Sequence, residues 1–469
     1  MAERATPRTE PTTVTAPVDV AVAPAEGAPA RDQADRPTLR LPLTQLYQLS
    51  IYWFGINAIW GGLNIIMQER IPPLAPPGEA GRYLAFLDIF AVIVAVAVQP
   101  TVGSISDYTM TRWGRRKPYI AIGSVLDVLF LIGIATSQTY LSIFAFMVLL
   151  QFSSNFAQGP FQGYLPDLVP AAQVGFASAI VGVMSILGVI GGTLVASAGY
   201  GLGSFVIPTI ALGLIELATA IGTVIWVREG RAPKDRGGRS WAAIAGEAWG
   251  LDVLRERSFL WLVGSRLFFL AGVAVLTKLI VLYMGRSLGL AESEKAFWVP
   301  ATSVVIAIAI VISTFPAARL SDRIGRKPVI YGACAIGAVG AAIGVVAPTV
   351  AVAEIAVLLL AVASGAFLAV DWALMTDIIP KASSGRYMGI SNVATACAGP
   401  FALLTAGTLM DIVGGPEESG SGPRAAFVVS ALMFAVAALL LTRVVPQRRE
   451  EDEPALTPVV INEVEQALT

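Results

Sequence analysis

The sequence contains no histidine, only two cysteines and few charges, since 14% of its 469 residues are Asp, Glu, Lys or Arg. Without imidazole, the usual zinc sites, Ser-His catalytic triads and neutral-pH proton switches are excluded. Cys334 and Cys397 both fall in apolar runs, so they support neither a disulfide framework nor a metal cluster. No window reads Gly-x-x-x-x-Gly-Lys-Ser/Thr, which excludes a Walker-type nucleotide site. These absences predict a protein that is not an enzyme and needs no metal or cofactor.

What the sequence has instead is an excess of apolar residues. They make up 55% of the chain, and the mean hydropathy is +0.70. Soluble domains are about 45–50% apolar and about 25% charged. Because so few charges cannot keep so much apolar surface in water, the lipid bilayer is the expected surroundings of the chain. The net charge of −1 provides no basic surface, so no nucleic-acid partner is expected.

Twelve segments reach the length of about 20 mostly apolar residues that crosses a bilayer. The sequence therefore predicts an all-α membrane protein with twelve transmembrane helices in two six-helix bundles. The predicted spans are 44–67, 83–104, 118–137, 140–163, 174–198, 202–227, 259–284, 296–318, 328–347, 350–376, 387–412 and 425–445.

The charges between the spans predict the orientation. Loops after even-numbered spans carry 17 Lys and Arg residues, whereas loops after odd-numbered spans carry 5. By the positive-inside rule, both termini lie in the cytoplasm. The predicted organisation is a disordered cytoplasmic tail at 1–40, a bundle at 41–228, a cytoplasmic linker with an interfacial helix at 229–257, a second bundle at 258–446 and a cytoplasmic tail at 447–469.

An internal repeat relates the two sets of six spans. Asp167 and Asp377 lie 210 residues apart in the similar stretches DLVPAAQVG and DIIPKASSG. Arg116 and Arg326 lie the same distance apart, and each is followed by Lys-Pro. Each landmark follows the corresponding span of its half, which indicates a duplicated six-helix unit. Parallel six-helix repeats of this kind are the plan of major facilitator transporters.

The loops after the second and eighth spans share a charged pattern. The first reads GSISD and then RWGRRK, and the second reads ARLSDRIGRK. Both resemble the loop signature of the major facilitator superfamily, Gly-x-x-x-Asp-Arg/Lys-x-Gly-Arg-Arg/Lys. A carboxylate can pair with a guanidinium or cap a helix start, while Gly allows a tight turn. We expect these charges to hold the cytoplasmic ends of the bundles closed; simple positive-inside anchoring is the alternative. The predicted gating residues are Gly103, Asp107, Arg112, Gly114, Arg115, Arg116, Asp167, Asp322, Arg323, Gly325, Arg326 and Asp377.

A longer stretch narrows the resemblance. QPTVGSISDYTMTRWGRRKPYI, at 99–120, resembles the sucrose-carrier branch of the superfamily, including the extra residues between Asp107 and Gly114. NFAQGP at 155–160 is similar to the same branch, which includes the proton-associated sugar transporters and is related to glycoside-pentoside-hexuronide cation symporters. The two stretches cover under a tenth of the chain. The resemblance implies the major facilitator fold and the transport of a small sugar.

Two charges that the resemblance implies are missing. Gln151 stands where an acidic, proton-carrying residue is expected, and Gln162 stands where an Arg is expected. Losing one of the two would leave a buried charge without its partner, so the double neutral replacement is physically consistent. Proton coupling is therefore expected to use a carboxylate at another position.

Amide side chains follow one face of the first span and one face of the fourth, where they recur at i, i+4, i+7 and i+11. Because amides are costly in hydrocarbon, each face is expected to line the bundle interior or a water-filled path. Amides hydrogen-bond sugar hydroxyls, and Trp rings stack on the C–H face of a sugar. Hydrogen bonding between packed helices is the alternative. The predicted substrate-binding residues are Asn57, Trp60, Asn64, Gln151, Asn155, Gln158 and Gln162.

Four charges lie at membrane depth, where charges are rare and suggest a function. Arg266 and Asp371 lie at matching depths on the seventh and tenth spans, so we expect them to pair and to tie proton or substrate binding to bundle closure. A permanent structural salt bridge is the alternative. Asp127 and Glu216 lie mid-span on the third and sixth spans, as proton carriers or as protonated structural carboxyls. These four are the predicted coupling residues.

Together these features predict a secondary transporter that moves sucrose or another small glucoside across the cell membrane by alternating access. The expected partners are the sugar, a proton as the coupling ion and the lipid bilayer, and the expected state is a monomer. Two alternatives remain open. A proton-coupled exporter of drug-like compounds predicts a more apolar lumen, and an uncoupled sugar facilitator predicts uptake that ignores the proton gradient.

Overall fold

The computed structural model describes residues 40–109, 111–170, 173–229, 237–238, 240–241, 257–378 and 384–444. In this part of the chain, twelve helices are long and apolar enough to cross a membrane, which confirms the predicted number of spans. The predicted tails and most of the predicted linker, with its interfacial helix, lie outside the described residues. The predicted bounds of the domains stay predictions.

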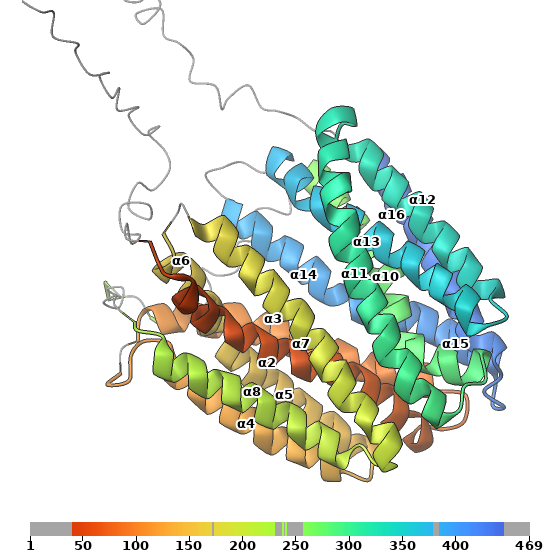
Figure 1. Cartoon of the computed structure of the whole chain (residues 1–469), viewed down its shortest axis with the longest axis horizontal. Helices are drawn as coiled ribbons and strands as arrows, with labels where there is room; N and C mark the ends of the chain where they lie inside the picture. The colour runs from red at the N-terminus through yellow and green to blue at the C-terminus, as the bar shows by residue number, and fades with distance from the viewer. Residues whose placement is uncertain are drawn as a thin grey trace, which may run out of the picture. The chain divides into compact units, whose positions relative to one another are not determined.

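The first half of the chain contains six membrane-length helices (Figure 1). The short segments η1 (Pro72–Leu74) and α6 (Tyr164–Leu168) lie between them. The long helices are α2 (Leu43–Arg70), α3 (Ala80–Asp107), α4 (Lys117–Thr136), α5 (Tyr140–Gln162), α7 (Val174–Leu202) and α8 (Val206–Trp226). Their bounds differ from the predicted spans by a few residues, mostly because the helices continue beyond the apolar run.

The second half repeats this plan with two interruptions. The π-helical segment η4 (Tyr283–Ser287) ends the seventh span, and η6 (Leu403–Gly407) divides the eleventh. Such π segments widen a helix locally and occur often at functional positions. The helices of this half are α10 (Arg257–Leu282), α11 (Glu292–Ile324), α12 (Arg326–Val346), α13 (Val350–Ile378), α14 (Ser384–Ala402), α15 (Thr408–Gly414) and α16 (Ser421–Thr442).

Within the first half, α2 packs closely against α7 and α8, and α4 packs against α5 and α8. The approach of α2 to α7 requires glycine. A Cβ on Gly192 would lie 1.9 Å from the carbonyl oxygen of Ala58, and one on Gly188 would lie 2.4 Å from that of Phe54. Gly188 and Gly192, four residues apart on α7, therefore allow this helix to approach α2 closely.

In the second half, α10 packs against α16 and α14, and α13 packs against α11 and α12. The core of this half contains Phe269 stacked on Phe367 with ring centroids 3.9 Å apart, and Phe434 meets Phe269 edge-on at 5.1 Å. Other large apolar side chains stay exposed, including Ile312, Phe315 and Leu439 at 66–67%. Exposed apolar side chains on membrane-length helices fit a surface that faces lipid.

Two ends of the helices are useful landmarks. We call one end of the helices the linker end: α3 and α8 end there, α10 begins there, and Glu229 caps the start of α4 there. The far end is where α2 finishes and α3 begins. The two halves contact each other through α7 with α11, α2 with α10, and α3 with α14 and η6.

Candidate functional site

The predicted gating residues of the first half form a buried ion cluster at the linker end. Arg116 lies 2.9 Å from Asp107 and 2.7 Å from Asp167, and Arg115 also pairs with Asp167. Both arginines are only 5% exposed. The predicted pairing of carboxylate with guanidinium is thus confirmed. These pairs join parts of the first half to one another, so in this conformation they brace one half rather than bridge the two.

A glycine makes room for the Arg116 side chain. A Cβ on Gly163 would lie 1.2 Å from Nη1 of Arg116, which donates a hydrogen bond to the carbonyl oxygen of Pro160 at 2.5 Å. Burial lowers the pKa of Arg116, while Asp167 and Asp107 act in the opposite direction. The guanidinium stays charged because the ordinary pKa of arginine is so far above neutral pH.

Glu229 is a member of this cluster that the sequence analysis missed. Its carboxylate accepts backbone N–H groups at the start of α4 from Arg115, from Arg116 at 3.1 Å and from Lys117 at 2.9 Å. The hydroxyl of Tyr164 also donates to it at 2.5 Å. Burial and the adjacent Glu229 carboxylate raise the pKa of Tyr164, so the hydroxyl stays a donor. A carboxylate at a helix N-terminus satisfies free N–H groups and opposes the helix dipole.

The glycines of the gating pattern have different roles. Gly114 and Gly325 adopt φ values of +120° and +90°, so the predicted tight turns are confirmed at both. Gly103 differs from this expectation, because it lies inside α3 and packs on the backbone of Gly159. Arg112 is exposed and lies over the ring of Trp113 at 5.8 Å.

The corresponding charges of the second half are arranged differently. Asp322 and Arg323 are exposed at the end of α11, and only Gly325 separates α11 from α12. Arg326 is half-buried at the start of α12. The side chain of Asp377 lies outside the described part of the chain, so its predicted gating role stays a prediction.

Polar contacts between the two halves gather at the far end. Asn64 on α2 donates to the carbonyl oxygen of Thr277 on α10 at 2.6 Å. Gln68, one turn later, accepts the backbone N–H of Val281 at 3.0 Å. Asn64 was predicted to contact substrate. In this conformation its amide instead makes the interhelical hydrogen bond that was the alternative.

Two carboxylates reinforce the contact at the far end. Asp88 on α3 lies 2.6 Å from Lys278 on α10, and Gly399 on α14 leaves space beside the pair. Asp411 on α15 accepts the backbone N–H groups of Gly81 and Arg82 at 2.9 and 2.8 Å, which caps the start of α3 from the other half.

Backbones also touch at this end. A Cβ on Gly81 would lie 2.3 Å from the carbonyl oxygen of Gly407 in η6. Beside it, Lys295 on α11 lies 2.7 Å from Glu69 on α2. The far end is therefore closed by four kinds of contact: amide, ion pair, helix cap and bare backbone.

The described side-chain hydrogen bonds of the amides on α5 stay within that helix, whereas Asn64 and Gln68 on α2 bond to the other half. Asn155 is 4% exposed, and its Nδ2 donates to the side-chain oxygen of Gln151 at 3.0 Å. On α2, Asn57 donates to the carbonyl oxygen of Trp53 on its own helix at 2.8 Å. Gln158 and Trp60 are half-buried, and Gln162 is exposed. The hydrogen bonds of Asn155 and Asn57 stay within their own helices and do not join the two halves.

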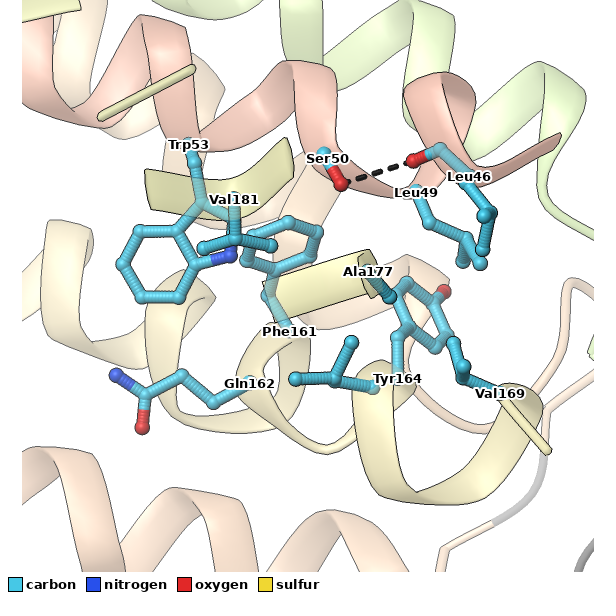
Figure 2. Close-up of a pocket in the computed structure, with 11 residues that line it drawn as sticks. Leu46, Leu49, Ser50, Trp53, Phe161, Gln162, Tyr164, Val169, Ala177 and Val181 are labelled. Atoms are coloured by element: carbon cyan, nitrogen blue, oxygen red, sulfur yellow. Dashed lines mark hydrogen bonds between the residues drawn. The ribbon is translucent and has the colours of Figure 1, made fainter. Parts of the chain in front are cut away.

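Side chains from α2 and α5 meet around a cavity of about 230 Å³ in the first half. Figure 2 shows the Trp53 ring beside the Phe161 ring, with Gln162 below them at the lower left of this cavity. The Trp53 and Phe161 rings lie 5.6 Å apart. The rest of the lining is mainly apolar and includes Leu46, Leu49, Val169, Ala177 and Val181.

At membrane depth in the second half, Arg266 on α10 pairs with Asp371 on α13, as the sequence predicts. The two side chains are 3% and 0% exposed. Nε of Arg266 also donates to Thr395 on α14 at 3.0 Å. One guanidinium therefore ties three helices together. A buried pair of this kind is costly to break from one side.

Asp127 and Glu216 lie in the first half, and the structure brings their helices together. Glu216 on α8 accepts hydrogen bonds from Tyr52 on α2 and Ser124 on α4, and Asp127 on α4 accepts one from Ser153 on α5. Hydroxyl groups rather than a cation are thus the hydrogen-bonding partners of both carboxyls.

Comparison with known proteins gives a family match over most of the chain. Residues 80–444 match the family model described as MFS/sugar transport protein. Among curated proteins, the human Membrane-associated transporter protein is 29% identical over 116 residues, and its mouse counterpart is 33% identical over 113 residues. These matches span 21% of this chain and 21% of each relative, about a fifth of their length.

Solved structures match over nearly the whole fold. The nucleoside transporter NupG has a TM-score of 0.64 at 14% identity and covers 86% of this chain and 100% of its own. A D-xylose-proton symporter has a TM-score of 0.59 at 18% identity, covering 87% and 98%. A bacterial homolog of the human lysosomal transporter Spinster has a TM-score of 0.65 at 13% identity, covering 85% and 95%. At these identities the likeness concerns the fold.

Proposed function

Because the chain belongs to the MFS/sugar transport protein family, we propose that this secondary transporter carries sucrose or another small glucoside across the cell membrane by proton-coupled symport. The observation that carries the proposal is the meeting of Trp53, Phe161 and Gln162 around one cavity; Phe161 and Gln162 share α5 with the Gln151–Asn155 amide pair. Aromatic faces and amides are the groups that bind the C–H faces and hydroxyls of a sugar.

The contacts at the two ends suggest how access alternates. The proposed orientation places the linker end and both termini in the cytoplasm, and the far end outside. The far-end contacts of Asn64, Asp88 and Asp411 then close the outer side. Opening that side requires these contacts to part while the linker ends of the two halves come together. The Arg115–Arg116 cluster keeps the first half rigid during this movement.

For the second half, we propose that Arg266 and Asp371 respond to substrate or proton binding. The guanidinium joins α10 to α13 and α14, so any change in its pairing changes the packing of three helices. The proposed unit is a monomer, since each half supplies its own part of the path.

Sucrose uptake into proteoliposomes tests the proposal. Purified protein is reconstituted, and radiolabelled sucrose is followed with and without an inward proton gradient. Accumulation that requires the gradient supports the symporter, and a protonophore serves as the control. Equilibration that ignores the gradient indicates an uncoupled facilitator. Vesicles that exchange no sucrose and no other glucoside would refute the sugar assignment.

The variant Asp371→Asn tests the second-half pair in the same assay. We expect loss of gradient-driven accumulation, because the pair is removed while the size of the side chain is kept. Unchanged accumulation would remove Asp371 from the coupling path and leave the pair as a structural bridge.

A second candidate is proton-coupled export of drug-like compounds. The mainly apolar lining of the cavity beside Trp53 favours it. This candidate predicts proton release driven by hydrophobic cations rather than by sugars, which a pH-sensitive dye inside the vesicles measures directly.

A further inference from the structure

Two fully buried carboxyl groups in the first half have only hydroxyl groups as hydrogen-bonding partners among the residues that the structure describes. Oε1 of Glu216 accepts from the hydroxyl of Tyr52 at 2.6 Å and from Ser124 at 2.8 Å, and Asp127 accepts from Ser153. Tyr52, Asp127 and Glu216 are all 0% exposed. The second oxygens of both carboxyls are buried and have no hydrogen-bond partner among the described residues.

The surrounding helices bring no positive charge to this cluster. The helices packed against α4 and α8 are α2, α5 and α7. The helices α5, α7 and α8 contain no Lys or Arg, and Glu216 is their only acidic residue. Arg70 is the last residue of α2 and donates to carbonyl groups at the C-terminal end of α4. Lys117 begins α4, about 15 Å along the helix from Asp127 at 1.5 Å per residue.

This arrangement cannot hold two negative charges. A buried carboxylate without a cation is strongly disfavoured, and two of them repel each other in a medium of low dielectric. The cheapest way to neutralise such a pair is to bind protons, and interacting carboxyls then titrate as one unit. The unpartnered oxygens of Glu216 and Asp127 are the positions where a proton can reside.

We propose that Tyr52, Ser124, Asp127, Ser153 and Glu216 form a proton-binding site that is separate from the Arg266–Asp371 pair and supplies the coupling proton. The inference rests on the proposed proton-coupled transport. Unlike the Arg266–Asp371 pair, this site exchanges a proton without breaking an ion pair.

The position of Tyr52 connects the site to the transport path. Its neighbour Trp53 lines the cavity, and the Tyr52 ring meets Phe161 edge-on at 4.8 Å. When the proton leaves, the Glu216 carboxylate holds the Tyr52 hydroxyl more strongly, because hydrogen bonds to a charged acceptor are the stronger ones. The same helix contacts the other half through Asn64. Proton occupancy therefore biases the position of α2, and by linkage sugar binding biases proton affinity.

Infrared difference spectroscopy detects the proton itself. The full-length protein in vesicles is shifted between acid and alkaline pH, and the C=O stretch of protonated carboxyls is identified by its shift in D2O. We expect Glu216→Gln and Asp127→Asn each to lose part of this band. We expect Tyr52→Phe to keep the band but to shift it, because the donor to Glu216 is gone while both carboxyls remain. A band that is unaltered in all three variants would overturn the proton site.

Sucrose transport then tests coupling. We expect Glu216→Gln and Asp127→Asn to lose gradient-driven accumulation while keeping sucrose counterflow, which needs no proton gradient. The matched control is Glu354→Gln, since Glu354 on α13 also accepts from a hydroxyl, that of Thr302, and lies apart from the proposed path. Its accumulation should match wild type. Full accumulation in both first-half variants would overturn the coupling role.

The two readouts separate the two proposals. If the wild-type protein carries no sucrose, the proposed function fails, yet the band still decides whether the site binds protons. If either carboxyl variant fails to fold, Tyr52→Phe carries the test: a shifted band supports the site and an unshifted band overturns it.

Discussion

The two halves of the molecule solve the same electrostatic problem in different ways. In the second half, Asp371 is buried at membrane depth against the guanidinium of Arg266. In the first half, Glu216 and Asp127 are buried as deeply but contact hydroxyl groups. An ion pair fixes a carboxylate in its charged form, whereas a hydroxyl network tolerates either form. A repeated fold can therefore hold a buried carboxylate by an ion pair in one half and leave carboxyls without a cation in the other half free to exchange protons.

The largest effect is expected from breaking the second-half pair on one side. Arg266→Gln leaves Asp371 buried without its cation, and we expect the free energy of unfolding to fall by about 3–5 kcal/mol. The double variant Arg266→Gln with Asp371→Asn should recover most of that loss, because no charge is left unpaired. Reversible unfolding in detergent mixtures measures both. A double variant as unstable as the single one would show that packing, not charge, dominates.

The next effect concerns the linker end, at a position where the two repeats differ. Gly163 in the first half corresponds to Ala373 in the second at the 210-residue offset. We expect Gly163→Ala to destabilise the protein by about 1–3 kcal/mol, because the new Cβ occupies the place of the Arg116 guanidinium. Thermal unfolding measures the loss. As the control, Gly182→Ala adds the same methyl group where no atom lies within 4 Å, and it should be neutral or stabilising.

A third effect comes from the helix starts. Glu229 caps α4, whereas the residue that precedes α12 is Gly325, which has no side chain to cap the helix start. Glu229→Gln should cost about 1 kcal/mol, because the amide cannot accept all the N–H groups and carries no charge to oppose the dipole. The unfolding midpoint reports this change. Equal stability at low and high salt would argue that the charge itself contributes nothing.

The smallest effect is expected at Asp88–Lys278, an ion pair that joins the halves at the far end. Asp88 and Lys278 are 19% and 28% exposed, so a double-mutant cycle with Asp88→Asn and Lys278→Gln should give a coupling energy of roughly 0.2–1 kcal/mol. We expect it to alter the rate of opening at the far end more than the stability. Labelling of a cysteine introduced beside the pair measures that opening. A coupling energy as large as that expected for Arg266–Asp371 would contradict this prediction, because the pair between the halves would then be as strong as the buried pair within one half.

The spans and the Arg266–Asp371 pair could be predicted from the sequence. Hydropathy determines the number of spans, since each must cross the same hydrocarbon thickness. The pair could be predicted because both residues lie at similar depths on helices of one half. The bounds were less accurate, because α11 continues to Ile324 through polar residues that hydropathy counts as loop.

Other features needed the tertiary structure. Glu229 lies in a charged stretch where a carboxylate is expected to contact water, and nothing in the sequence links it to the start of α4, 112 residues earlier. Asn64 donates to the backbone carbonyl oxygen of Thr277. Because every residue has such a carbonyl group, the side chain at position 277 does not identify the acceptor. Glu216 and Asp127 were identified separately, but only the packing of α4 against α8 shows that they share one environment.

The contact of Gly81 with Gly407 has a consequence for the balance between the open and closed states of the far end. Most joints between helices freeze side-chain rotamers when they form and release them when they part, so entropy favours opening. Two bare backbones have no rotamers to lock or free. The far end therefore gains no disorder from this contact when it opens, and the balance between its open and closed states rests on hydration of the polar groups around it. Ionic strength and solvent, rather than side-chain bulk, should govern how often this end opens.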